Sequence, residues 1–288
     1  MTISQNPIVL VTGASRGAGK GIALALAEQL GATVYITGRS QRSGDSPLPG
    51  TIFETAELVD KRDGKGIPVA CDHRDDAQVK ALFAQIERDH GHLDILVNNA
   101  LCVPEGLTQE GPFWEKPLGL QELFNVGLRS SYVASYYAAP LLLKAGSGLI
   151  VNTSSAGGRC YMHGPAYGAG KAAVDKMAHD MAVDFKDHNI AVIPLWMGLL
   201  STERSLQVFA AQPELYAEAA AMAESPEFPG RVIAALAKDP ELMGRSGKVA
   251  YTAELAEEYG ISDIGGEQRY SPRGMLGDPT EFNPAIIA

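Results

Sequence analysis

Short apolar runs rich in β-branched residues alternate with longer segments whose apolar residues recur at helical spacing. The apolar runs predict strands near residues 8–12, 33–37, 68–71, 93–97, 149–153 and 191–195. The amphipathic segments predict helices over residues 20–30, 53–61, 75–89, 120–144 and 166–188. Strands that alternate with helices in this way are typical of a parallel sheet. The sequence therefore predicts an α/β fold, a single doubly wound parallel sheet of the Rossmann type with helices on both faces.

We expect one domain over residues 1–288. Within it, an Ala-rich helical segment at about 203–230 is interrupted by prolines and has the character of a lid, and a mixed tail covers about 240–288. Substrate selectivity is expected from this lid and from two loops before and after the fifth strand. The candidate wall residues are Trp114, Tyr161, Leu206, Phe209 and Tyr216.

Composition narrows the class of protein. The chain is 45% hydrophobic and 20% charged, which is typical of a globular protein. A net charge of −10 without a basic run argues against binding to nucleic acid or to an anionic membrane. No signal-peptide pattern and no run of 18 apolar residues is present. The three cysteines and six histidines show no metal-ligand spacing, so we expect a cytoplasmic protein with reduced thiols and no metal.

A glycine-rich turn follows the first predicted strand and opens the first predicted helix. Glycines allow a tight turn and a close approach of a pyrophosphate, and free N–H groups at the helix start favour the anion. Such a turn alone is weak evidence, but its strand–turn–helix position favours dinucleotide binding. The candidate binding residues are Gly13, Ser15, Arg16, Gly17, Ala18 and Gly19.

The end of the second strand bears on which nicotinamide cofactor binds. An acidic residue there selects NAD(H) through the ribose hydroxyls. Gly38 occupies that position in this chain, and Arg39 follows it. Arg39 and Arg16 can pair with a 2′-phosphate, so the sequence favours NADP(H) over NAD(H), unless Arg39 is only a solvated surface residue.

Tyr167 and Lys171 are the candidate catalytic pair. Residues four apart lie on one face of a helix, so both can address one cofactor site, where Lys171 is expected to hold the cofactor ribose. A nearby ammonium favours the phenolate, which suits the tyrosine to general acid–base catalysis. Ser154 and Ser155 end the fifth strand, where ligands of open α/β sheets bind. Counting along the strand favours Ser155 as the partner and counting back from Tyr167 favours Ser154; we prefer Ser155.

These motifs, TGxxxGxG and YxxxK, resemble the short-chain dehydrogenase/reductase superfamily over about residues 8–203. Strings such as FNVGLRS, YGAGKAAVDKMA and LAKDPELMGRSGKV are similar to the dehydrogenase/reductase member 1 subgroup, and extend the resemblance into the tail. Two positions depart from the family pattern. Leu101 replaces a glycine after Asn99 and Ala100, and Met197 replaces a proline before Gly198.

The resemblance implies further site residues. Asn125 is expected to hold a water in a proton relay to Lys171, and Asp72 to contact adenine. The backbone at Asn99 and Ala100 is expected to pass the cofactor. Gly198, Leu200 and Thr202 are expected to meet the nicotinamide amide.

The resemblance also implies an activity. We expect an NADP(H)-dependent oxidoreductase that interconverts a carbonyl and an alcohol, with Tyr167 as general acid or base, and that reduces a broad range of apolar carbonyl substrates. A homodimer or homotetramer is the family norm. The rival hypothesis is a catalytically idle NADP(H)-binding sensor or scaffold, to which the departures at Leu101 and Met197 give some weight.

Overall fold

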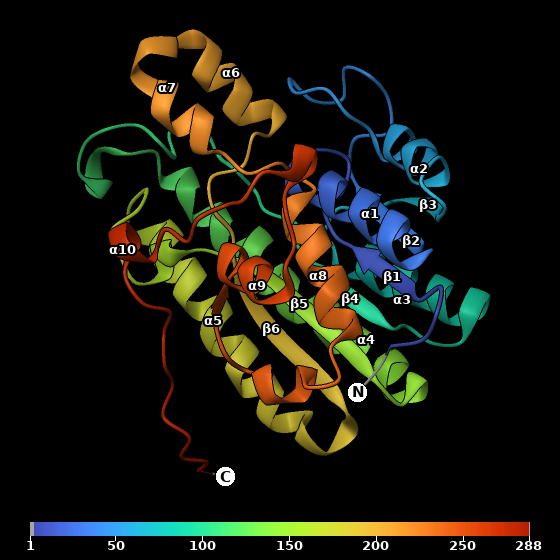
Figure 1. Ribbon diagram of the computed structural model, residues 1–288. Coiled ribbons are helices and arrows are strands. Elements are labelled where there is room, and N and C mark those ends of the chain that lie inside the picture. Colours follow the sequence, from blue (N-terminus) through green and yellow to red (C-terminus); the bar gives the residue numbers. More distant parts are fainter. Residues whose placement is uncertain (1–2, 288) are drawn as a thin grey trace.

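A computed structural model of the chain describes residues 3–287, and within them the chain forms one seven-stranded sheet (Figure 1). The strands are β1 (Ile8–Val11), β2 (Thr33–Gly38), β3 (Lys65–Ala70), β4 (Ile95–Asn98), β5 (Gly148–Ser154), β6 (Ile190–Trp196) and β7 (Ala250–Tyr251). Their order is β3-β2-β1-β4-β5-β6-β7, and every neighbouring pair is parallel. The predicted fold class is confirmed, and the two-residue β7 is an addition that the sequence pattern does not reveal.

Helices cover both faces of the sheet. The helices are α1 (Gly17–Leu30), α2 (Ile52–Asp60), α3 (Asp76–His90), α4 (Ser130–Ala145), α5 (Pro165–Asp184), α6 (Glu203–Ala211), α7 (Pro213–Met222), α8 (Phe228–Lys238), α9 (Thr252–Tyr259) and α10 (Arg273–Leu276). Successive strand residues alternate between two buried layers, as the pleat requires. Val9 and Val11 pack with α1, α2, α8 and α9, whereas Ile8 and Leu10 pack with α3, α4 and α5. Both faces of the central strands are therefore core, which explains their uninterrupted apolar runs.

The two ends of the sheet differ from its centre. β3 forms one outer edge, and it carries the exposed Lys65 and a proline, Pro68, in mid-strand. β7 forms the other edge and pairs with β6 through only two residues, Ala250 and Tyr251.

Helices α1 and α8 pack closely because Gly21 has no side chain. An ideal Cβ on Gly21 would lie 2.1 Å from both the carbonyl carbon and the oxygen of Pro226. Gly230, on α8, makes a similar approach to the backbone of Ile22. The contact between these two helices thus depends on glycine.

Replacing Gly21 with alanine is expected to lower the free energy of unfolding by about 1–3 kcal/mol, since the added methyl group has to displace backbone. The better helix propensity of alanine, about 1 kcal/mol, offsets only part of this. Urea denaturation would measure the change. Gly244→Ala is the control, because its Cβ would meet nothing within 4 Å. Equal stability of the two variants would contradict the close α1–α8 contact.

The prediction of one continuous helix over residues 120–144 is wrong, because regular α-helix begins only at Ser130. A 3₁₀ turn at Leu118–Gln121 and a π-helical turn at Phe124–Arg129 precede α4, and the backbone leaves helical geometry at Val126 and Gly127. Gly127 has a φ of 145°, and a Cβ there would lie 2.7 Å from Cδ1 of Leu101. Cys102 N–H also donates to the Val126 carbonyl at 2.9 Å. The loop after β4 therefore occupies the space that a continuous helix needs.

Helices α6 and α7 form a pair that projects from the rest of the molecule (Figure 1). They follow residues 197–202, which leave the end of β6. Helix α8, by contrast, begins at the fully buried Phe228 and belongs to the core. The projecting pair therefore ends at Met222, earlier than the lid expected to about residue 230.

None of the helices within residues 3–287 has both the length and the apolar character needed to cross a bilayer. Nor do any three histidine, cysteine or carboxylate side chains in that range lie together as metal ligands.

Candidate active site

The turn between β1 and α1 is shaped by the loop that follows β4. Gly13 has a φ of +67°, and a Cβ there would lie 2.7 Å from Cα of Ala100. A Cβ on Gly19 would lie 2.4 Å from Nδ2 of Asn99. The Thr12 hydroxyl, which sequence reasoning did not single out, accepts hydrogen bonds from the N–H groups of Asn99 and Ala100 at 2.9 Å each. The turn and the β4 loop are thus built as one unit that requires glycine.

The first turn of α1 already binds an anion. Arg16 occupies the N-cap without a side-chain capping bond, and the next N–H, that of Gly17, donates to a carboxylate oxygen of Glu203 at 2.8 Å. Ser15 and Ala18 flank these two residues in the same turn. Helix N-termini favour anions through free N–H groups and the helix dipole. The residues present therefore fit the pyrophosphate of a dinucleotide.

Three guanidinium groups gather beside this turn. Arg16 donates to the Ser40 hydroxyl at 2.8 Å and to two carbonyls of the loop at residues 49–50. Burial lowers the pKa of Arg16, and the positive charges of Arg204 and Arg39 lower it further, while Glu203 opposes them. Arg39 is exposed at the end of β2, and Arg204 lies in the first turn of α6. Sequence reasoning missed Arg204 because its contribution depends on how α6 folds back.

Tyr167 and Lys171 both lie on α5 and meet the end of β5. The Lys171 Nζ lies 5.7 Å from the centre of the Tyr167 ring and donates to the Thr153 carbonyl at 3.0 Å. The Ser155 side chain lies beside the Tyr167 phenol, while its hydroxyl accepts the Gly157 N–H at 3.0 Å and donates to the Met162 Sδ at 3.5 Å. Ser154 lies on the other side, with its hydroxyl 3.5 Å from the Lys171 carbonyl oxygen. Of the two serines, the structure thus brings Ser155 to the phenol.

Burial dominates the proton affinities of this pair. It raises the pKa of the Tyr167 phenol, which the nearby Ser155 hydroxyl opposes. It lowers the pKa of Lys171 to about 8, which the charge of Asp175 opposes. The sequence suggested instead that the ammonium lowers the phenol pKa. The difference arises because burial has the larger effect on the phenol, while the ammonium donates to the Thr153 carbonyl.

Asn125 lies in the π-helical turn that packs against α5, not within a regular helix. Its Nδ2 donates to a carboxylate oxygen of Glu122 at 3.0 Å. The same Glu122 lies 3.5 Å from the guanidinium of Arg74. The structure thus places Asn125 near the catalytic helix but bonded to an acidic neighbour.

Asp72 follows β3 at the same edge of the sheet as the glycine-rich turn. Its carboxylate accepts the backbone N–H of Arg74 at 3.0 Å. The adjacent His73 is buried, and its Nε2 lies 2.8 Å from the Thr37 hydroxyl. Burial lowers the pKa of His73 to about 4, so the ring is neutral at physiological pH. Sequence reasoning missed His73, whose only signal is its place directly after the acidic position.

The segment after β6 is held by a residue that the sequence did not suggest, Glu224. Its carboxylate accepts the N–H of Gly198 at 3.2 Å, and its backbone bonds to Leu199 and Ser201 at 2.7 and 2.9 Å. A bridge also pairs it with Leu200. Glu224 thus stabilises the turn after β6. The backbone of this turn is less restricted than in the family pattern because Met197 replaces a proline.

Thr202 ends the same segment and begins the lid. Its hydroxyl accepts the N–H of Ser205 at 3.3 Å and caps α6. Thr202 also lies against the glycine-rich turn, 3.6 Å from the position that a Cβ on Gly17 would take. Two predicted cofactor-binding residues that are far apart in the sequence are therefore neighbours in the fold.

Stability is expected to depend on the proton of Glu224. Burial raises the pKa of this carboxyl to about 7 and the neighbouring Asp263 adds to the rise, whereas the Gly198 N–H and Arg269 oppose it. The folded chain thus binds this proton more tightly than the unfolded chain. Stability from this group is therefore present below about pH 4.5 and is lost as the pH rises through about 7.

Glu224→Gln is expected to remove this loss, which amounts to as much as about 3 kcal/mol. Melting temperatures measured between pH 5 and 8 would show a flatter profile for the variant than for the unchanged chain. Glu218→Gln, at an exposed position of α7, is the control and should keep the original slope. Parallel profiles for the Glu224 variant and the unchanged chain would disprove the prediction.

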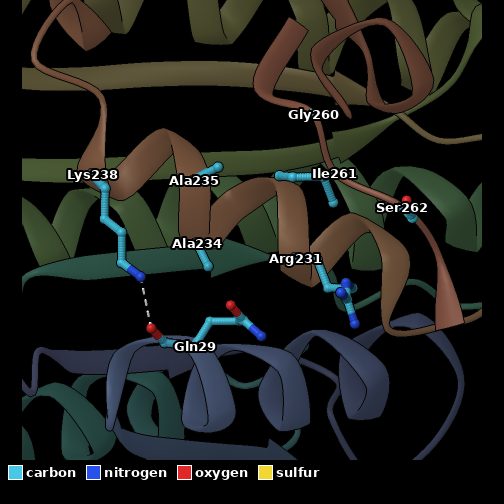
Figure 2. Close-up of a pocket in the computed structure, with 8 residues that line it drawn as sticks. All are labelled: Gln29, Arg231, Ala234, Ala235, Lys238, Gly260, Ile261 and Ser262. Carbon is cyan, nitrogen blue, oxygen red and sulfur yellow. Dashed lines mark hydrogen bonds between the residues drawn. The ribbon is translucent and has the colours of Figure 1, made fainter. Parts of the chain in front are cut away.

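Two cavities differ in their relation to these residues. One of about 250 Å³ is lined by Arg16 and the loop at residues 42–50. A larger one, of about 340 Å³, lies between α1, α8 and the segment after α9, where Lys238 donates to the Gln29 carbonyl (Figure 2). None of the residues that line the larger cavity belongs to the predicted site. Of these two cavities, the smaller is lined by a predicted cofactor-binding residue, Arg16.

Comparison with known proteins agrees with this arrangement. The model of the short chain dehydrogenase family matches residues 7–213. The chain is 42% identical over 273 residues to the mouse (Mus musculus) protein dehydrogenase/reductase SDR family member 1, covering 91% of this chain and 84% of the relative. The human (Homo sapiens) protein of the same name is 40% identical over 270 residues, covering 90% and 83%.

Solved structures lead to the same family. A crystal structure described as a dehydrogenase from Xanthomonas campestris superposes with a TM-score of 0.76 at 26% identity, covering 95% of this chain and 96% of that chain. One described as a short-chain dehydrogenase/reductase from Burkholderia xenovorans superposes with a TM-score of 0.71 at 26% identity, covering 86% and 94%. The chain therefore belongs to the short-chain dehydrogenase/reductase family and, over most of its length, is similar to dehydrogenase/reductase SDR family member 1.

Proposed function

We propose that this protein is an NADP(H)-dependent oxidoreductase that interconverts a carbonyl and an alcohol, acting chiefly as a reductase of apolar carbonyl compounds. Its family makes it an oxidoreductase that transfers hydride with a nicotinamide cofactor. The observation that carries the finer proposal is the meeting of Ser155 and Tyr167 at the end of β5, with the Lys171 Nζ 5.7 Å from the centre of the Tyr167 ring.

The cofactor site follows from the contacts of the turn. The pyrophosphate is held by the N–H groups of the glycine-rich turn at residues 13–19, where Glu203 is the present acceptor. A 2′-phosphate is paired by Arg39 and Arg16, with Arg204 nearby. Asp72 would contact the adenine, the β4 loop at Asn99 and Ala100 would support the turn, and Gly198, Leu200 and Thr202 would hold the nicotinamide end. Bound in this way, NADPH supplies the hydride for the reaction.

Three side chains where α5 meets the end of β5 transfer the proton and orient the substrate. Tyr167 donates its phenolic proton to the carbonyl oxygen during reduction and accepts it during oxidation. Ser155, which lies beside that phenol, donates to the same substrate oxygen and orients it. The Lys171 ammonium stabilises the phenolate that forms. Asn125, on the turn that packs against α5, supports the relay that returns a proton to Lys171.

Exposed apolar side chains support an apolar substrate. Trp114 and Tyr161, on the loops before and after β5, are 73% and 80% exposed, and Leu206 on α6 is 52% exposed. Phe209 is buried against Tyr216, with 5.9 Å between ring centres, and so joins the two lid helices together. The first three residues, and not this pair, are available to a substrate. We extend the proposal to a homo-oligomer in the cytoplasm.

The test is to follow NADPH absorbance with a panel of ketones, quinones and aldehydes, and to repeat the panel with NADH. Turnover of apolar carbonyls with a preference for NADPH is the expected result. Cofactor binding measured by fluorescence, without turnover of any member of the panel in either direction, would favour a nucleotide-binding sensor and overturn the proposed reaction.

A further inference from the structure

A buried carboxylate follows the catalytic pair along the same helix. Tyr167, Lys171 and Asp175 are spaced four residues apart on α5 and so lie along one face. Asp175 is completely buried, and Lys171 is 8% exposed. Carboxylates and ammonium groups are rarely buried unless they are paired. Helix formation alone therefore does not explain why a carboxylate is buried at position 175.

The neighbours of Asp175 come from the ends of two strands. Its Oδ2 accepts the indole N–H of Trp196 at 2.9 Å, and Trp196 is the last residue of β6. The opposite residue in the β5–β6 register is Ser154, whose hydroxyl also interacts with the carboxylate. The other oxygen, Oδ1, is buried and has no hydrogen bond of normal geometry from the described residues. The carboxylate thus joins α5 to the strand ends directly beneath the catalytic residues.

The charges around this pair are few. Asp175 is the charged group that acts on Lys171, and Lys171 is the charged group that acts on Asp175. The ends of β5 and β6 contribute the Thr153 carbonyl, the hydroxyls of Ser154 and Ser155 and the Trp196 indole, and neither strand contains a charged residue. The thiol of Cys160, from the loop after β5, acts on Tyr167 instead. The two buried charges therefore depend on one another.

We propose that Asp175 is a positioning residue for the Tyr167–Lys171 pair, supplying the buried counter-charge that keeps Lys171 positively charged at the ends of β5 and β6. The catalytic part of this inference rests on the proposed function. The link between the two charges does not, because it follows from their burial one helical turn apart on α5.

The proton affinities agree with this geometry. Burial raises the pKa of Asp175 to about 6, against the opposing effects of Ser154, Trp196 and Lys171. The pKa of Lys171, lowered by burial to about 8, would be lower still without the carboxylate. Both groups are therefore charged together between about pH 6 and pH 8.

The first experiment uses the full chain without cofactor. The titration of Lys171 is followed by NMR of isotope-labelled lysine Cε, and its resonance is assigned by its absence from Lys171→Met. Asp175→Asn is expected to move the Lys171 midpoint down by about one pH unit or more. Asp180→Asn, which removes an exposed carboxylate from the same helix, should leave the midpoint in place. An unchanged Lys171 midpoint in Asp175→Asn would overturn the proposal.

The asparagine variant is expected to fold, because an amide oxygen can still accept the Trp196 N–H and a buried charge is removed. Asp175→Ser is a second neutral replacement that tests the same shift if the amide is not accommodated. Asp175→Glu keeps the charge and should restore the midpoint to near its original value. A midpoint that falls equally with glutamate, asparagine and serine would show that packing, not charge, is responsible, and would also overturn the proposal.

The second experiment measures the pH profile of kcat for alcohol oxidation. The loss of charge on Lys171 disfavours the phenolate, so Asp175→Asn should move the rising limb toward higher pH by up to about one pH unit. Asp175→Glu should move it back, and a profile that keeps its original midpoint in Asp175→Asn would contradict the catalytic role. Absence of turnover in the unchanged chain would refute the proposed function, while the lysine titration would still decide the inference about Asp175.

Discussion

Replacing Tyr167 with phenylalanine is expected to lower kcat for carbonyl reduction by about 10²–10⁴-fold, the range typical of a lost general acid. The substitution removes one hydroxyl from a ring that is already packed against Gly157 and His163, so the fold should be kept. Affinity for NADPH should change little, because the phosphate turn lies on other elements. Steady-state turnover together with NADPH titration would separate the two effects.

Tyr270→Phe is the matched control for this prediction. Tyr270 lies in the C-terminal tail, is 86% exposed, and has no hydrogen bond from its hydroxyl among the described contacts. Its variant should keep kcat within a few-fold of the original. Retention of full activity by Tyr167→Phe would remove the phenol from the mechanism and, with it, the basis for the roles given to Ser155 and Lys171.

Replacing Arg39 with aspartate is expected to shift the ratio of kcat/KM for NADPH over NADH by about 100-fold toward NADH. A hydrogen bond to a charged group contributes about 1.5–3 kcal/mol, which corresponds to roughly 10- to 100-fold, and the new carboxylate adds repulsion of the 2′-phosphate. Aspartate can also accept hydrogen bonds from ribose hydroxyls, which favours NADH. Initial rates with both cofactors would give the ratio.

Arg88→Asp makes the same change of charge on the exposed surface of α3 and controls for the net charge of the chain. It should leave the cofactor ratio unchanged. If Arg39→Asp leaves the ratio unchanged as well, the 2′-phosphate does not lie at Arg39, and the preference for NADP(H) loses its main support.

The fold could be predicted from the sequence because its determinants are local. Alternation of β-branched strands with amphipathic helices gave the order of elements and the parallel sheet. The break before α4 could not be predicted in this way, because it depends on Leu101, which reaches Gly127 from the loop after β4. The helical spacing of apolar residues continues across this break. The break itself is caused by a tertiary contact, which the spacing does not reveal.

The same distinction applies to the site. Tyr167, Lys171 and the glycine-rich turn are recognisable from spacing alone. Ser154 and Ser155 could not be separated from sequence, since a difference of one residue reverses the direction of a side chain at a strand end. Glu224 and Arg204 act through elements that fold back on the dinucleotide region, and no spacing rule connects them to it.

The two outer strands restrict how copies of this protein can associate. A free strand edge invites another chain to add to the sheet, which leads to aggregation or to continuous sheets across subunits. Here Pro68 removes a backbone donor from β3 and Lys65 adds charge to it, while β7 offers only two residues. Both edges therefore disfavour the addition of a strand from a second copy to the sheet.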